Sequence, residues 1–97
     1  LLLAAGNETT TNLIGNGVLA LMAHRQQAAA WGGDPAGARA AVEELLRYDS
    51  PVQLTDRVAL EDCEIGGKRI RRGQLAALVL GSANRDPEQF AAADHLD

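Results

Sequence analysis

The first quarter of the chain has the hydrophobic spacing of one long helix, from Leu1 to about Ala23. Inside it, the run Ala5–Thr10 places a glycine, a carboxylate and hydroxyls in a helix interior. Such residues are costly there, because glycine loses backbone entropy and short polar side chains compete for backbone hydrogen bonds. The helix is therefore either poorly formed or built to hold something polar against its face. Its apolar stripe consists of Leu13, Ile14, Val18, Leu21 and Met22.

Two shorter helices are predicted next. Gln26–Trp31 has helical character and is followed by Gly32–Gly33, a strong stop signal. Asp34 then suits an N-cap and Pro35 the first helical position, so a third helix is expected from there to about Tyr48. The order of elements is thus long helix, short helix and medium helix.

After the third helix the hydrophobic period changes from helical to extended. Glu64–Ile70 predicts a hairpin with Gly66–Gly67 as its two-residue turn. The apolar run Leu75–Leu80 predicts a buried strand, and Ala83–Pro87 a short helix or turn. The fold class expected is α+β, mainly α, with a small antiparallel sheet after the helices. Further short extended segments are indicated by Val52, Leu54, Val58 and Leu60.

Composition narrows the class of protein. The 97 residues suffice for one modest domain, and 46% apolar residues argue against disorder. A net charge of -4 argues against nucleic acid as a partner. The single cysteine, Cys63, cannot form an internal disulfide, which fits a reducing compartment. The polar run Asn7–Asn12 argues against the first helix crossing a membrane.

Three sets of side chains are candidates for chemistry, and each has a simpler explanation. Glu8 beside Thr9 could relay protons to a ligand, or could be a polar patch facing solvent. Glu44 and Arg47 are three residues apart, so they can pair on one helix face, buried or exposed. Arg57 could bind an anionic ligand group, or could pair with a nearby aspartate on the surface.

Taken in order, these pieces resemble the cytochrome P450 family of heme-thiolate monooxygenases, in its bacterial soluble branch. Ala5–Thr10 is similar to the family's oxygen-activating motif on the long I helix. Glu44-x-x-Arg47 resembles its K-helix motif, and Thr55–Ala59 the strand whose arginine binds a heme propionate. Asn84–Pro87 is similar to the segment before the family's meander. The resemblance covers nearly the whole chain, and the order of four motifs makes it specific.

The resemblance implies roles for individual residues. Thr9 would hydrogen-bond the bound dioxygen, and Glu8 would help to deliver protons for cleavage of the O–O bond. Glu44 and Arg47 would be structural. The heme-binding residues would be Ala5, Gly6, Thr9, Thr10 and Arg57, the last by pairing with a propionate. The residues near substrate would be Leu2, Val52 and Leu54.

It also implies what the parent protein does. A heme monooxygenase would insert one atom of O2 into a small organic substrate, with electrons from a ferredoxin and ferredoxin reductase type of donor, in the cytoplasm and without a membrane or nucleic acid. Residues 1–97 would be a P450 domain truncated at both ends. No metal ligand is expected within the chain, because the axial cysteine should lie downstream of Asp97. The chain alone should therefore be inactive.

Two alternatives stay open at this point. The parent could be an incomplete or degenerate copy, a module of the same fold without catalysis. The chain could also be an unrelated α+β domain in which Glu8 and Thr9 are incidental.

Overall fold

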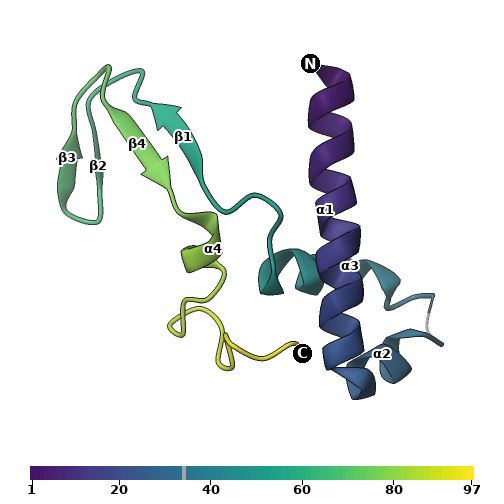
Figure 1. Cartoon of the computed structure of the whole chain (residues 1–97). Coiled ribbons are helices and arrows are strands. Elements are labelled where there is room, and N and C mark those ends of the chain that lie inside the picture. Colours follow the sequence, from purple (N-terminus) through teal and green to yellow (C-terminus); the bar gives the residue numbers. More distant parts are fainter. Residues whose placement is uncertain (34) are drawn as a thin grey trace.

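A computed structural model describes residues 1–33 and 35–97 and shows helices followed by two small antiparallel sheets (Figure 1). The expected α+β class with a mainly helical first half is confirmed. The helices are α1 (Leu2–Ala23), α2 (Arg25–Trp31), α3 (Ala38–Tyr48) and α4 (Leu80–Ala83). The strands are β1 (Thr55–Val58), β2 (Cys63–Ile65), β3 (Lys68–Ile70) and β4 (Leu75–Leu78).

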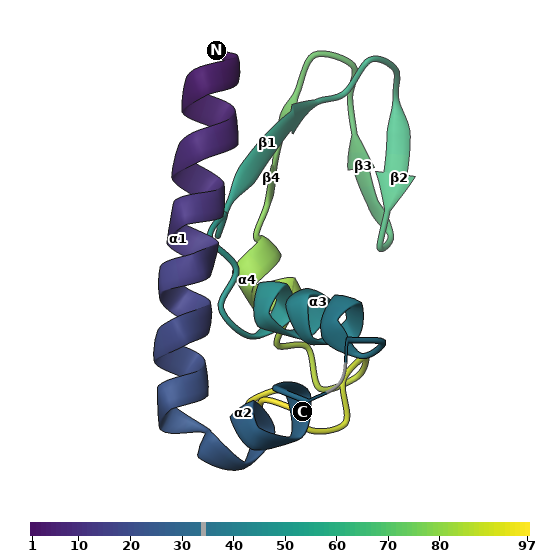
Figure 2. The ribbon, with the colours of Figure 1, turned by 90° about the vertical axis from the view of Figure 1, so that its right-hand side faces the viewer.

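The long helix α1 packs through its C-terminal half and extends clear of the other helices through its N-terminal half (Figures 1 and 2). α2 and α3 contact it near its C-terminal end. Gly17 is buried at the contact with α3, where a Cβ would stand 3.1 Å from Cδ1 of Leu45. A glycine at this position therefore lets the two helices approach closely. The N-terminal half, which carries Ala5–Thr10, remains accessible over most of its surface.

α1 is α-helical throughout, so the polar residues around Glu8 and Thr9 do not interrupt the helix. The physical reason is local. The hydroxyl of Thr9 donates to the carbonyl oxygen of Ala5 at 3.0 Å, four residues earlier. This is the ordinary way for a threonine to satisfy its hydroxyl inside a helix, and it leaves the helix intact.

α3 begins at Ala38, later than the sequence pattern predicts. Pro35 lies in a turn and is not the first helical residue, so that expectation was wrong. Gly37 occupies the N-cap position, and a glycine inside the first turn would cost about 1 kcal/mol relative to alanine. The helix therefore starts after the glycine. The predicted N-cap, Asp34, lies outside the described residues.

The predicted hairpin is present as β2 and β3, in antiparallel register with Cys63 opposite Ile70. Gly66 and Gly67 have φ values of 56° and 72°, a conformation that glycine adopts without the steric cost borne by other residues. β1 pairs with β4 instead, with Thr55 opposite Leu78. The strands thus form two separate two-stranded sheets where one was expected.

The strand predicted over Leu75–Leu80 differs from the structure in length and burial. β4 ends at Leu78, and Leu80 already belongs to α4. The strand is also exposed, with 65% of Leu75 accessible, because none of the described helices covers the β1–β4 pair. An apolar run indicates that a segment prefers burial, but it does not supply the element that buries it.

The described residues bury little apolar surface. Only Ala20, Ala93 and Leu96 are buried hydrophobic residues in this part of the chain. By contrast, Ile14 and Met22 on α1 are each 63% exposed. Across residues 1–33 and 35–97, none of the helices combines the length and apolarity that a membrane crossing needs. Two of the three, Ala93 and Leu96, lie in the C-terminal segment, which hydrogen-bonds to Arg47 on α3.

Candidate functional site

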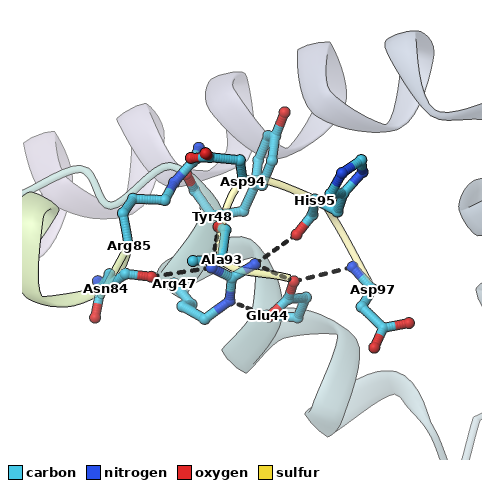
Figure 3. Close-up of polar contacts among 9 residues, drawn as sticks. All are labelled: Glu44, Arg47, Tyr48, Asn84, Arg85, Ala93, Asp94, His95 and Asp97. Carbon is cyan, nitrogen blue, oxygen red and sulfur yellow. Dashed lines mark hydrogen bonds and ion pairs between the residues drawn. The ribbon is translucent and has the colours of Figure 1, made fainter. Parts of the chain in front are cut away.

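Among the described residues, the densest polar cluster is built around Arg47, near the end of α3 (Figure 3). Its Nε donates to Oε2 of Glu44 at 2.6 Å, and its Nη2 donates to Oε1 of Glu44, also at 2.6 Å. The pair is therefore bidentate, and the two side chains are only 10% and 17% exposed. The expectation that these two residues form a structural pair on one helix face agrees with this geometry.

Arg47 also binds the C-terminal segment of the chain. Nη1 donates to the carbonyl oxygens of Asn84 at 2.9 Å and Ala93 at 2.7 Å, and Nη2 donates to that of His95 at 2.7 Å. A guanidinium has five N–H donors, and here all five have an acceptor. The backbone N–H of Asp97 completes the cluster by donating to Oε1 of Glu44 at 3.0 Å.

A second arginine, Arg85, reinforces the same junction. Its Nη2 donates to the carbonyl oxygen of Tyr48 at 2.6 Å, and its Nη1 pairs with Asp94 at 3.0 Å. Its guanidinium carbon lies 4.4 Å from the centre of the Tyr48 ring. Sequence reasoning placed Arg85 in a motif but gave it no role. Its acceptor at the end of α3 is the backbone carbonyl of Tyr48, and the identity of a residue does not indicate that its carbonyl will be an acceptor.

The environment of the pair shifts both of its pKa values. Burial raises the pKa of Glu44, but hydrogen bonds from Arg47 and from the N–H of Asp97 outweigh it, and the pKa lies below the ordinary 4.5. The hydrogen bond with Glu44 raises the pKa of Arg47 further. The pair is therefore ionised at neutral pH, as a structural ion pair must be if it is to offset its desolvation.

Acid should weaken this junction in a defined direction. Because the pKa of Glu44 is lower folded than unfolded, its contribution to stability is complete above the unfolded value of 4.5 and is lost as pH falls through the folded value. Urea unfolding of the full-length protein and its Glu44→Gln variant, from about pH 7 to about pH 3, should show a free-energy difference that shrinks in acid. A difference independent of pH would contradict the ionised pair.

The residues predicted to lie beside bound oxygen are on the N-terminal half of α1. Thr9 is half-buried and its hydroxyl proton is directed to Ala5. The hydroxyl thus presents its lone pairs to anything that approaches this turn. Glu8 and Thr10 are exposed. Apart from the chain neighbours of Gly6 and the adjacent backbone of α1, no described atom comes within 4 Å of the place where a Cβ on Gly6 would stand, so the backbone is accessible there.

The remaining predicted residues lie on the connection after α3 and on β1. Arg57 donates through Nη1 to Oγ1 of Thr55 at 3.1 Å and to the carbonyl oxygen of Asp56 at 2.8 Å. Among the described residues it forms no ion pair, so the surface pair considered as the simpler explanation is not seen. The residues expected near substrate are accessible, with exposed fractions of 91% for Leu2, 37% for Val52 and 54% for Leu54.

Within the described part of the chain, the residues predicted to contact heme or oxygen are not linked directly to the cluster around Arg47. Among residues 1–33 and 35–97, no hydrogen bond or ion pair connects Glu8, Thr9 or Arg57 with the cluster around Arg47. The roles inferred for the first three residues stay predictions.

The hairpin and the turn after it carry a basic run, Lys68, Arg69, Arg71 and Arg72, which is partly neutralised within the chain. Nη2 of Arg69 pairs with Asp62 at 2.7 Å, and the backbone N–H of Arg72 donates to the same carboxylate at 2.9 Å. These hydrogen bonds hold the pKa of Asp62 below its ordinary value. Cys63 is exposed on this hairpin, between Asp62 and Glu64 in the sequence.

Comparison with known proteins decides the family. The family pattern described as Cytochrome P450 matches residues 38–97, which is more than half of the chain. The chain belongs to the cytochrome P450 family. It is 50% identical over its entire length to the biotin biosynthesis cytochrome P450 of Bacillus subtilis, and 49% identical to the vitamin D(3) 25-hydroxylase of Pseudonocardia autotrophica. These matches cover 25% and 24% of the relatives, so the chain spans about a quarter of a curated P450.

Solved P450 structures agree with the fold. P450BioI, crystallised with a hexadec-9Z-enoic acid-ligated acyl carrier protein, matches 96% of this chain and 24% of its own at 50% identity, with a TM-score of 0.85. The tirandamycin C-bound P450 monooxygenase TamI matches the whole chain and 25% of its own at 45% identity, with a TM-score of 0.87. The arrangement of α1 to α4 and the two sheets is therefore that of a segment of a bacterial P450.

Proposed function

We propose that residues 1–97 are the internal part of a longer P450 domain, and that the parent protein is a heme-dependent monooxygenase. The observation that supports this best is the turn around Thr9. Its hydroxyl is fixed on the carbonyl of Ala5, beside backbone at Gly6 that no other described element covers. A hydroxyl fixed in a polar turn of the helix, next to accessible backbone, suits a ligand that lies flat against the helix and carries a small polar molecule.

The residues present fit a heme. Ala5 and Gly6 offer a flat backbone surface, and Arg57 carries a guanidinium that has no carboxylate partner in the described part of the chain. Such a group suits a propionate. When bound with a cysteine thiolate, heme supplies the activation of O2 that oxygen insertion needs.

The chain's own residues then hold the reacting molecule and its protons. Because the hydroxyl of Thr9 donates to the carbonyl oxygen of Ala5, its lone pairs would be available to accept a hydrogen bond from a molecule held beside this turn. Glu8, exposed on the adjacent position, exchanges protons with solvent and passes them toward that turn. Thr10 is exposed on the same turn and adds a second hydroxyl there. Glu44 and Arg47 act at a distance, by fixing the C-terminal segment against α3.

The rest of the assignment follows the family. The substrate is an organic molecule in the region of Leu2, Val52 and Leu54, and electrons come from a ferredoxin type of donor in the cytoplasm. The ligands named for two relatives, an acyl carrier protein carrying a fatty acid and tirandamycin C, differ in kind. Membership of the family therefore supports an organic substrate without choosing among them.

The test is the full-length protein expressed from its gene. The reduced, carbon monoxide-bound form should show the thiolate-heme Soret band, and Arg57→Ala should lose heme about 10- to 150-fold faster, as expected for one charge-assisted hydrogen bond worth about 1.5–3 kcal/mol. Arg71→Ala, an exposed arginine on the turn after β3, serves as the control and should retain heme. A protein without that band would instead support a degenerate, non-catalytic copy.

A further inference from the structure

The connection between α3 and β1 is fixed to the elements on either side of it. It lies between α1 and α4, as both views of the ribbon show (Figures 1 and 2). At its start, Nδ2 of Asn16 on α1 donates to the carbonyl oxygen of Asp49 at 3.3 Å. Further along, the carbonyl oxygen of Gln53 accepts from the N–H of Gly81 on α4 at 3.2 Å. This segment is irregular in structure but held at both ends.

Hydrogen bonds within the segment close it into a tight turn. Nε2 of Gln53 donates to the carbonyl oxygen of Ser50 at 2.6 Å. Oγ of Ser50 donates to the carbonyl oxygen of Val52 at 2.9 Å. Pro51 lies inside the turn and restricts its backbone further. The Gln53 side chain is thus bonded back onto its own segment, and its amide cannot also serve a ligand through that N–H.

The Gln53 side chain also lies against the backbone of Gly81. A Cβ on Gly81 would collide with Oε1 of Gln53. Any larger residue at this position would have to displace the glutamine amide, because the amide is the movable end of a side chain while Gly81 is fixed by its backbone hydrogen bond. A substitution at either Gln53 or Gly81 therefore changes the position of the same side-chain amide or removes it.

We propose that Gln53 is a positioning residue that sets the shape of the substrate side of the site. It stands between Val52 and Leu54, the two accessible apolar residues of the segment, so the backbone that carries both is fixed by its side chain. Gln53 itself contacts no substrate in this scheme. The inference rests on the proposed function and names, within it, a residue that determines which molecules fit.

The experiment uses the full-length holoenzyme and two heme-ligating probes of different size, imidazole and 4-phenylimidazole, titrated by absorbance. Gln53→Met keeps the length of the side chain and removes its hydrogen bond. The ratio of the two Kd values should change about tenfold, the lower range for a methylene-sized change in an apolar pocket, while the Kd for imidazole is unchanged. Gly81→Ala should change the ratio as well, because it displaces the same amide.

Gln26→Met, an exposed glutamine on α2, is the matched control and should leave both constants unchanged. If Gln53→Met yields no holoenzyme, Gly81→Ala decides the question on its own. Unchanged ratios in the variants that retain the thiolate-heme band would overturn the role of Gln53 alone. A wild-type protein without that band would reject the proposed function, and the inference with it.

Discussion

Replacing Arg47 with alanine should lower the free energy of unfolding of the full-length protein by about 3–5 kcal/mol, the cost of breaking a buried ion pair. The substitution leaves the carboxylate of Glu44 without its bidentate partner and removes the donors to three backbone carbonyls. The net free energy of unfolding of a native protein is only about 5–15 kcal/mol. Little holoprotein should therefore accumulate. Heme content and urea unfolding measure the two effects.

Arg39→Ala is a suitable control, since Arg39 is an exposed arginine on the same helix. It should change stability by no more than about 0.5 kcal/mol. Arg47→Lys should behave like the alanine variant in kind, because an ammonium has three donors and cannot reproduce the bidentate pair. Normal heme content in Arg47→Ala would refute the structural role.

Replacing Thr9 with alanine should separate oxygen consumption from product formation while heme stays bound. The variant loses the lone pairs that Thr9 presents beside Ala5 but leaves the backbone of α1 unchanged. Removing one hydrogen-bonding group that acts on a reacting oxygen costs about a hundredfold in favourable cases. The measurement is product formed per NAD(P)H consumed, with the remaining electrons appearing as hydrogen peroxide or water.

Thr9→Ser keeps the hydroxyl and should recover most of the coupling. Thr11→Ala removes a different hydroxyl, one that donates to Oδ1 of Asn7 at 3.2 Å, and should leave the coupling ratio close to that of the wild type. An unchanged ratio in Thr9→Ala would show that the proposed role of this hydroxyl is wrong.

The elements with local signals were predictable from the sequence. α1 follows from the spacing of its apolar residues, and the hairpin follows from Gly66–Gly67, whose positive φ values suit glycine. The start of α3 was misplaced because two local preferences compete. Pro35 favours a first helical position, whereas Gly37 disfavours the helix interior, and the structure follows the glycine.

The parts that depend on distant contacts were not predictable. The spacing of Glu44 and Arg47 indicates a pair, but the acceptors that complete it are the carbonyls of Asn84, Ala93 and His95. A backbone carbonyl has no residue-type signature, so sequence reasoning cannot locate it. The same holds for Gln53, whose carbonyl oxygen accepts from the N–H of Gly81, and for the division of the strands into two sheets.

The five bonds of Arg47 also imply an order of assembly. Residues 84–97 contain no helix or strand, and their ordering depends on a cation that lies 37 to 48 positions earlier in the chain. α3 can form from local contacts as soon as it is synthesised, but the guanidinium is then two-fifths satisfied by Glu44 alone. A nascent chain that ends before His95 leaves polar N–H groups without acceptors. Burial of Arg47 therefore becomes favourable only after His95, the last residue that supplies an acceptor, has been translated.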